Sequence, residues 1–197
     1  MRFIAISILL PILIFVVYMD VIYEPQLKTV SAELDLTAII AAHEQEQEEL
    51  RLAREKKARE PYVRKITAKY GVDEFLADEI VKVAKKKANK HITYKDIIAI
   101  IGIESSFRPN ICSQLRPDPA CGLMQIRGGI WRISAWELHD VERNIGHGTR
   151  ILTHYYQILG RKDGAIQAYN IGITAYLGGQ SNDVYLEKYQ REVAFYR

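Results

Sequence analysis

The segment from Tyr94 to Ser106, YKDIIAIIGIESS, constrains the fold of this chain more than any other part of it. Its isoleucines lie on nearly all sides of a helix, and a helix of that kind is stable only when other elements surround it. Thr93 precedes the segment as an N-cap, with Asp96 three residues later in an imperfect capping box. The sequence therefore predicts a central, buried helix.

The residues from Tyr62 onward predict further short helices around this central one. Asp73 can cap a helix that runs through Ala84. Strand-like alternation is scarce, and residues 107–130, rich in Pro, Cys and Gly, predict a long ordered loop or a small β excursion. We therefore expect a mainly α fold class. The remaining helical patterns cover residues 144–159, 163–170 and 183–196.

The N-terminal residues form a separate segment. No charge interrupts the apolar run from Phe3 to Met19, which is near the short end of a membrane-spanning helix. Arg2 precedes the run and Asp20 follows it, so the positive-inside rule places the N-terminus in the cytoplasm. We expect residues 1–23 to be a transmembrane signal anchor of a single-pass inner membrane protein. The alternatives are export after cleavage of a signal peptide and a phage virion or lysis protein.

Residues 24–61 predict a charged helical stalk. Glu55 and Arg59 are spaced four apart in the favourable order, and Pro61 is expected to end the helix. Apolar residues thin out after Ala42, so no sustained heptad supports a coiled coil. The stalk is read as a solvated spacer, with a partner-binding helix as the alternative. Residues 62–197 then form the main domain, which the anchor would place in the periplasm.

Composition and charge exclude several function classes. The formal net charge of +3 is too small to indicate a nucleic-acid partner. Two cysteines cannot supply a four-ligand zinc site, and the histidines lack ligand spacing, so we predict no metal and no cofactor. Cys112 and Cys121 can form a disulfide in an oxidising compartment or remain as two thiols. The lysine cluster 82–90 is read as a hydrated face, or as a surface for an anionic polymer or membrane.

Glu104 is the candidate for acid–base chemistry. It ends the isoleucine-rich helix, where apolar surroundings and the negative end of the helix dipole both disfavour a carboxylate. Both effects raise the pKa, and a carboxylic acid that stays protonated near neutral pH can act as a general acid. Ser105 and Ser106 are placed to hydrogen-bond it. The alternative is a helix-end glutamate that points into water.

Four short motifs occur after one another in a specific order. They are IESSF followed by P-N at 103–110, GLMQI at 122–126, NI-x-x-G at 144–148 and AYNIG at 168–172. Together they resemble the soluble lytic transglycosylase family, which shares a lysozyme-like fold with goose-type lysozyme. The resemblance covers roughly residues 62–197. It departs where Ser106 replaces the common glycine and in the cysteine-containing loop.

The resemblance implies a role for each matching position. Glu104 matches the catalytic acid/base, and Tyr169 a tyrosine whose hydroxyl reaches that glutamate. The other implied substrate-binding residues are Ser105, Met124, Gln125 and Asn170. Six aromatic residues are candidates to line a sugar groove: Trp131, Trp136, Tyr155, Tyr156, Tyr176 and Tyr185.

The family cleaves the β-1,4 bond between N-acetylmuramic acid and N-acetylglucosamine in peptidoglycan and leaves a 1,6-anhydro end. Most glycosidases use two carboxylates, but Asp118, Glu137, Asp140 and Asp163 match no motif position. A single-carboxylate transglycosylase is therefore expected, with a hydrolytic lysozyme or a silent wall-binding protein as alternatives. The expected partners are peptidoglycan strands, the membrane, and a secretion, conjugation or phage-entry apparatus.

Overall fold

The computed structural model describes residues 24–197, with side chains from residue 36 onward. The predicted membrane segment, residues 1–23, lies outside the described residues. Within the described part, no helix combines the length and the apolar character needed to cross a membrane. The chain divides into two compact units, residues 1–56 and 57–197.

The first unit consists, in its described part, of the N-terminal portion of helix α2, which spans Glu24–Tyr70. Its side chains from residue 36 to residue 56 are exposed. Arg51 connects Glu48 and Glu55 on one face, at 2.5 and 2.6 Å. Ion pairs this exposed to solvent contribute little to stability, so this stretch is a solvated helix.

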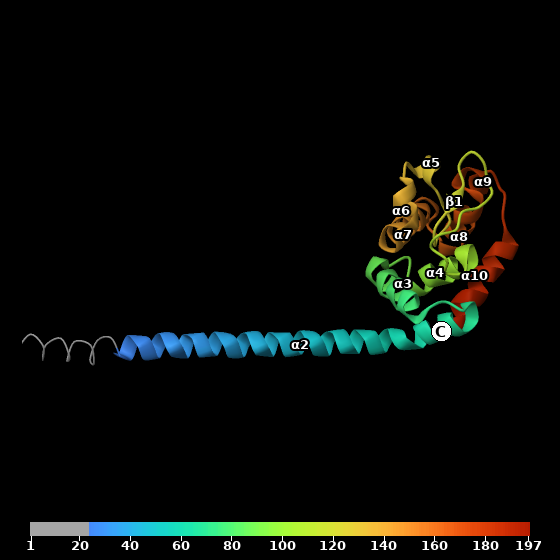
Figure 1. Ribbon diagram of the computed structural model, residues 1–197. Coiled ribbons are helices and arrows are strands. Elements are labelled where there is room, and N and C mark those ends of the chain that lie inside the picture. Colours follow the sequence, from blue (N-terminus) through green and yellow to red (C-terminus); the bar gives the residue numbers. More distant parts are fainter. Residues whose placement is uncertain (1–23) are drawn as a thin grey trace, which may run out of the picture. The chain divides into compact units, whose positions relative to one another are not determined.

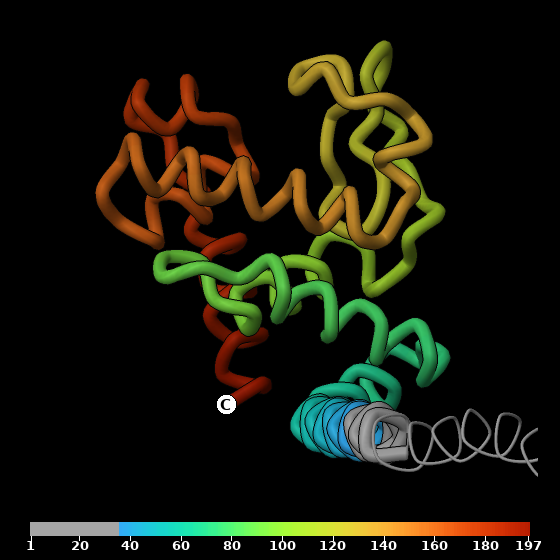
Figure 2. Tube along the Cα trace, turned by 90° about the vertical axis from the view of Figure 1, so that its left-hand side faces the viewer, coloured from blue at the N-terminus to red at the C-terminus, as the bar shows by residue number. Residues whose placement is uncertain are grey.

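The second unit is built mainly from helices (Figure 1). One small antiparallel sheet pairs Ala120 with Arg127 and Cys121 with Ile126. Figure 2 shows α7 running from the segment that contains this sheet to α8. The elements after α2 are α3 Glu74–Lys87, α4 Tyr94–Ser105, β1 Ala120–Cys121, β2 Ile126–Arg127, α5 Gly128–Trp131, α6 Ala135–His139, α7 Val141–Leu159, α8 Lys162–Ile171, α9 Ile173–Leu177 and α10 Asp183–Phe195.

Helix α4 is central in this unit, as the sequence predicts. It packs against α3 and α10, and its residues from Ile97 to Ile101 are fully buried. The Thr93 hydroxyl accepts from the Asp96 backbone N–H, and the Asp96 carboxylate accepts from the Thr93 N–H, so the capping box is complete. The Asp96 carboxylate also accepts from Tyr189 of α10 and Lys162 of α8, at 2.6 Å each. This buried carboxylate connects three helices.

The prediction that Pro61 ends a helix is wrong. Helix α2 continues through Pro61 to Tyr70. Proline removes one backbone hydrogen bond inside a helix, but Val63 and Ile66 on the next turn are buried in the core of the second unit. Burial of two such side chains is worth about 1.5–3 kcal/mol each, which offsets the cost of the proline.

The segment 107–130 forms the expected ordered loop with a small β excursion. Ser106 and Phe107 have positive φ angles of 51° and 61°, which turn the chain away from α4. A disulfide joins Cys112 to Cys121 and closes the loop between them. The three short helices α5, α6 and α9 have no counterpart in the predicted elements. Each has at most five residues, too few for a periodic pattern.

Candidate active site

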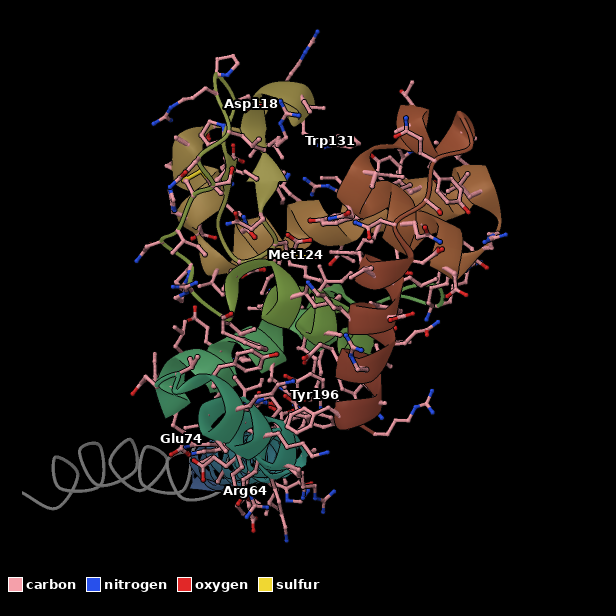
Figure 3. The ribbon with its side chains drawn as sticks, turned by 90° about the vertical axis from the view of Figure 1, so that its right-hand side faces the viewer. Arg64, Glu74, Asp118, Met124, Trp131 and Tyr196 are labelled. Carbon is pink, nitrogen blue, oxygen red and sulfur yellow. A yellow bond between two sulfur atoms is a disulfide. The ribbon has the colours of Figure 1, made fainter. Side chains whose placement is uncertain are left out.

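Glu104 lies in the last turn of α4 and borders a cleft of about 890 Å³. One wall of the cleft comes from the loop and sheet segment, including Leu115, Arg127 and Trp131. The opposite wall comes from residues 170–180, around α9. In Figure 3, Trp131 lies on the first wall, with Met124 below it, close to α4. The carboxylate of Glu104 thus lies half-buried between two walls.

The environment of Glu104 favours its protonated form. Burial raises the pKa of Glu104 to about 7, which confirms the predicted direction. The Tyr185 hydroxyl donates a hydrogen bond to Glu104 Oε1 at 2.5 Å and opposes part of this rise in pKa. No salt bridge joins Glu104 to a cation among the described residues. At neutral pH the group is therefore divided between acid and base forms.

Tyr185, rather than Tyr169, is the tyrosine that donates to Glu104. Tyr185 comes from α10, eighty-one residues after Glu104, and is 6% exposed. The Tyr169 hydroxyl instead donates to the Met124 carbonyl at 2.7 Å. Burial and the nearby Glu104 raise the pKa of both tyrosines well above the usual value, so both are neutral donors.

Three of the predicted substrate-binding residues line the cleft: Gln125, Tyr169 and Asn170. The side chain of Gln125 donates to the backbone carbonyls of Ile111 and Gly122, at 3.2 and 2.9 Å. Asn170 is exposed, and its Oδ1 accepts from Asn182 at 2.7 Å. Their side chains are therefore held by the protein at the border of the cleft.

Ser105 and Met124 do not line the cleft in this structure. Ser105 is 1% exposed, and its hydroxyl donates to the Ile101 carbonyl of its own helix at 3.1 Å. Met124 is fully buried in the core. Its backbone N–H donates to Asn144 Oδ1 at 2.8 Å. These two residues pack behind the residues that line the cleft and do not present a side chain to a ligand.

The motif glycine Gly122 explains why the loop packs so closely. It has a φ of +79°, and a Cβ at this position would overlap the Leu138 carbonyl oxygen and the Asn144 amide. Asn144 donates to the carbonyls of Cys121 and Leu138, at 3.2 and 2.8 Å. Asn144 of the third motif, residues 144–148, therefore holds the backbone of the second motif, residues 122–126, which carries Gln125.

Of the six aromatic candidates, Trp131 and Tyr155 line the cleft. Trp136 is 58% exposed and packs under the Arg143 guanidinium, away from the cleft lining. Tyr185 serves Glu104 through its hydroxyl. The sequence signal for Tyr185 is weak, because a tyrosine on an amphipathic helix usually serves packing alone.

The other candidate carboxylates have structural roles. Asp118 accepts from the backbone N–H groups of Gly129 and Ile130, while Glu137 and Asp140 cap α6 and α7. Asp163 lies in the first turn of α8. Among the described residues that line the cleft, Glu104 is the one carboxylate.

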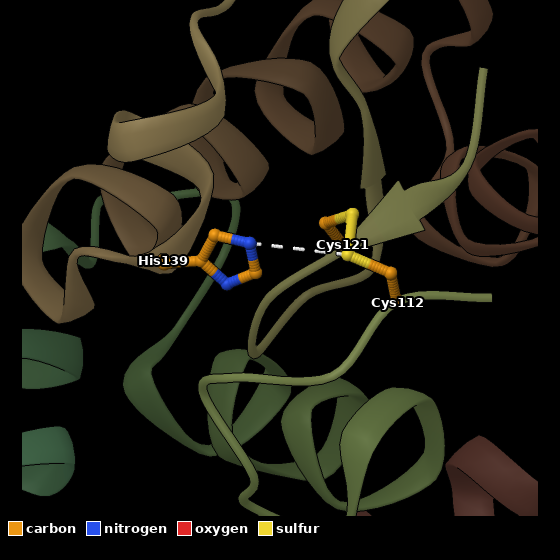
Figure 4. Close-up of side chains that lie close together, drawn as sticks. All are labelled: Cys112, Cys121 and His139. Carbon is orange, nitrogen blue, oxygen red and sulfur yellow. Dashed lines mark hydrogen bonds between the residues drawn. A yellow bond between two sulfur atoms is a disulfide. The ribbon is translucent and has the colours of Figure 1, made fainter.

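His139 lies beside the disulfide (Figure 4). Its Nε2 is 3.9 Å from Cys112 Sγ, and its Nδ1 is 3.1 Å from the Pro109 carbonyl oxygen. Cys112, Cys121 and His139 place ligand atoms within 4.8 Å of one another. Because the two sulfurs are bonded to each other, they are not thiolate ligands in this state.

A helical domain that holds a glutamate with a pKa of about 7 in a cleft has the arrangement of an acid–base enzyme. The model of the transglycosylase SLT domain family matches residues 79–190, which is more than half of the chain. The chain belongs to this family, whose members are peptidoglycan lytic transglycosylases, and it is therefore an enzyme of the glycan lyase class. No curated protein matches the chain.

Proposed function

We propose that this enzyme cleaves the β-1,4 bond between N-acetylmuramic acid and N-acetylglucosamine without water, with Glu104 as its single acid and base. The observation that carries the proposal is a carboxyl with a pKa of about 7 in a cleft whose described lining contains no second carboxylate. An inverting hydrolase needs a second carboxylate to activate water. One carboxyl suffices when the substrate itself supplies the nucleophile.

In the first step, protonated Glu104 donates its proton to the glycosidic oxygen as the bond to muramic C1 breaks. The N-acetyl group of the muramic residue stabilises the positive charge that develops at C1. The Tyr185 hydroxyl, already bonded to Glu104 Oε1, stabilises the carboxylate that this step creates.

In the second step, the Glu104 carboxylate takes the proton from the muramic 6-hydroxyl. The oxygen of that hydroxyl then forms a bond to C1, which closes the 1,6-anhydro ring and returns the proton to Glu104. The two steps together neither consume nor release water. Gln125 and Asn170 border the cleft and are proposed to orient the sugar.

The test is product analysis on purified sacculi. Mass spectrometry should find anhydro ends with the wild-type enzyme and none with Glu104→Gln, which keeps the shape and removes the acid. Glu137→Gln is the matched control, because Glu137 caps α6 outside the cleft. Reducing ends in place of anhydro ends would indicate the hydrolytic alternative. If Glu104→Gln clears a turbid suspension of sacculi as fast as the wild-type enzyme does, the acid–base role is refuted.

The cellular setting is a second part of the proposal. We infer that residues 1–23 anchor the enzyme in the inner membrane and place residues 62–197 in the periplasm. The support is the uncharged run from Phe3 to Met19 behind Arg2. Fractionation of cells should recover the full chain with membranes, and a chain without residues 1–23 should not be exported. We propose that such an anchored enzyme opens the wall locally for a secretion, conjugation or phage-entry apparatus.

A further inference from the structure

A second hollow surface lies on α7, next to the catalytic cleft. It consists of two adjoining cavities of about 420 and 230 Å³, which share Arg150 and His154. The smaller cavity also shares Trp131 and Ile151 with the catalytic cleft. We call these two cavities the α7 groove. The groove therefore adjoins the cleft at Trp131 and Ile151.

The α7 groove is cationic. Of the described residues that line it, two are the cations Lys87 and Arg150, and none is Asp or Glu. Arg150 is exposed and contacts His147 Nδ1 at 2.5 Å, and no salt bridge joins it to a carboxylate of the described part of the chain. Lys87 shares the single carboxylate of Glu142 with Lys86, at 2.8 and 2.9 Å. The junction of the two cavities therefore carries the positive charge of Arg150, and the cluster of Lys86, Lys87 and Glu142 beside the larger cavity keeps one positive charge in excess.

The lining also combines apolar and hydrogen-bonding groups. Trp131 and Ile133 supply apolar surface beside Arg150 in the smaller cavity. Asn89 lies at the border of the larger cavity, where its amide donates to Thr153 Oγ1 at 2.9 Å. Two separate cations, with the apolar surface of Trp131 and Ile133 beside Arg150, suit a short peptide that carries carboxylates and methyl side chains. A polymer of phosphates would favour a denser set of cations.

Together these features indicate what the groove recognises. We infer that the α7 groove binds the carboxylates of the peptide stem attached to muramic acid, while the glycan strand lies in the catalytic cleft. This inference rests on the proposed peptidoglycan substrate. The stem branches from the sugar strand, and the groove adjoins the cleft at Trp131 and Ile151, so a strand in the cleft has the groove beside it. The enzyme should therefore prefer peptide-bearing strands over bare glycan.

The experiment compares two substrates: glycan strands with their stem peptides, and the same strands after an amidase has removed the peptides. Wild-type enzyme should process the peptide-bearing strands with a lower KM, by about three- to tenfold for two partly exposed charge contacts. Lys87→Gln/Arg150→Gln should lose this preference and keep the wild-type rate on bare strands. The preference of the wild-type enzyme should also shrink as the salt concentration rises.

The matched control is Lys82→Gln/Lys188→Gln, which removes the same charge from exposed positions outside the groove. It should keep the preference. Arg150→Gln alone is an additional variant, because its exposed side chain can be replaced without disturbing the core. Thermal melts of each variant report whether the fold is intact.

The outcomes separate this inference from the proposed function. If wild-type enzyme and Lys87→Gln/Arg150→Gln show the same preference ratio, the inference is overturned although bare strands are cleaved. If the variant instead loses binding to vesicles that contain phosphatidylglycerol, with stem peptides making no difference, the groove is a lipid surface and the inference is again overturned. Failure of wild-type enzyme on both kinds of strand would count against the proposed function itself.

Discussion

The hydrogen bond from Tyr185 to Glu104 gives the sharpest test of the acid–base assignment. Tyr185→Phe removes the donor and keeps the ring, so the pKa of Glu104 should rise further, because this bond favours the carboxylate. A hydrogen bond to a charged group exceeds one to a neutral group by about 1 kcal/mol. The pKa of Glu104 should therefore rise above its value of about 7, by roughly 0.7 of a pH unit.

The direction in which the pH profile shifts depends on which form of Glu104 acts in the first step. The first step needs the protonated acid, so activity falls on the alkaline side as Glu104 ionises. In Tyr185→Phe the alkaline limb of kcat/KM should move upward by about 0.7 pH unit. The rate on the plateau should also fall by about fivefold, because the carboxylate formed in the first step loses about 1 kcal/mol of stabilisation.

The assay is the initial rate of anhydro-product release between pH 5 and 9. Tyr189→Phe is the matched control, because its hydroxyl also donates to a carboxylate from α10, but to Asp96. This control should lose about 1–2 kcal/mol of stability and keep the position of the alkaline limb. An alkaline limb that stays in place or moves downward in Tyr185→Phe would refute the reasoning.

Three other predictions concern stability. Burial raises the pKa of Glu104 in the folded state from its ordinary value of 4.5 to about 7. The stability of the wild-type protein is therefore full below pH 4.5 and falls as the pH rises to about 7, so Glu104→Gln should be more stable than wild type by about 3 kcal/mol above pH 7. A difference in unfolding free energy between the two proteins that stays constant across pH in urea melts would contradict this. Cys112→Ser/Cys121→Ser opens a loop with a sequence separation of 9, so the free energy of unfolding should fall by about 2.5 kcal/mol. The KM should also rise, because that loop forms one wall of the cleft. Equal melting temperatures of the wild-type protein with and without a dithiol would argue against this. Gly122→Ala should lower the free energy of unfolding by roughly 3 kcal/mol or more, because its Cβ would overlap the backbone. Gly160→Ala should lower it by about 1 kcal/mol, because Gly160 has a φ of +68° but open space around it. Comparable melting temperatures for the two variants would show that backbone strain alone determines the loss.

The centre of the fold could be predicted from the sequence because its signals are local. The isoleucines around Ile100 demand burial on all sides, and Thr93 with Asp96 marks where the helix begins. The same pattern predicts that Glu104 ends this helix in apolar surroundings, which is the cause of its raised pKa. Burial and capping depend on neighbours a few residues away, so a single segment carries the information.

The contacts across the fold could not be predicted in the same way. Periodicity shows that the face of α10 with Tyr185 packs inward, but it does not show which group the hydroxyl meets. The family motif suggests Tyr169 for that role, and the structure gives the contact to Tyr185. Ser105 lies beside Glu104 in sequence but points back into its helix, because successive residues of a helix face different directions.

Helix α10 has a consequence for catalysis although the four sequence motifs all precede it in the chain. Tyr185 and Tyr189 lie one turn apart on α10 and donate to two different carboxyls of α4, Glu104 and Asp96. A change that displaces α10 would therefore deprive Glu104 of its phenol donor even where every motif residue is kept.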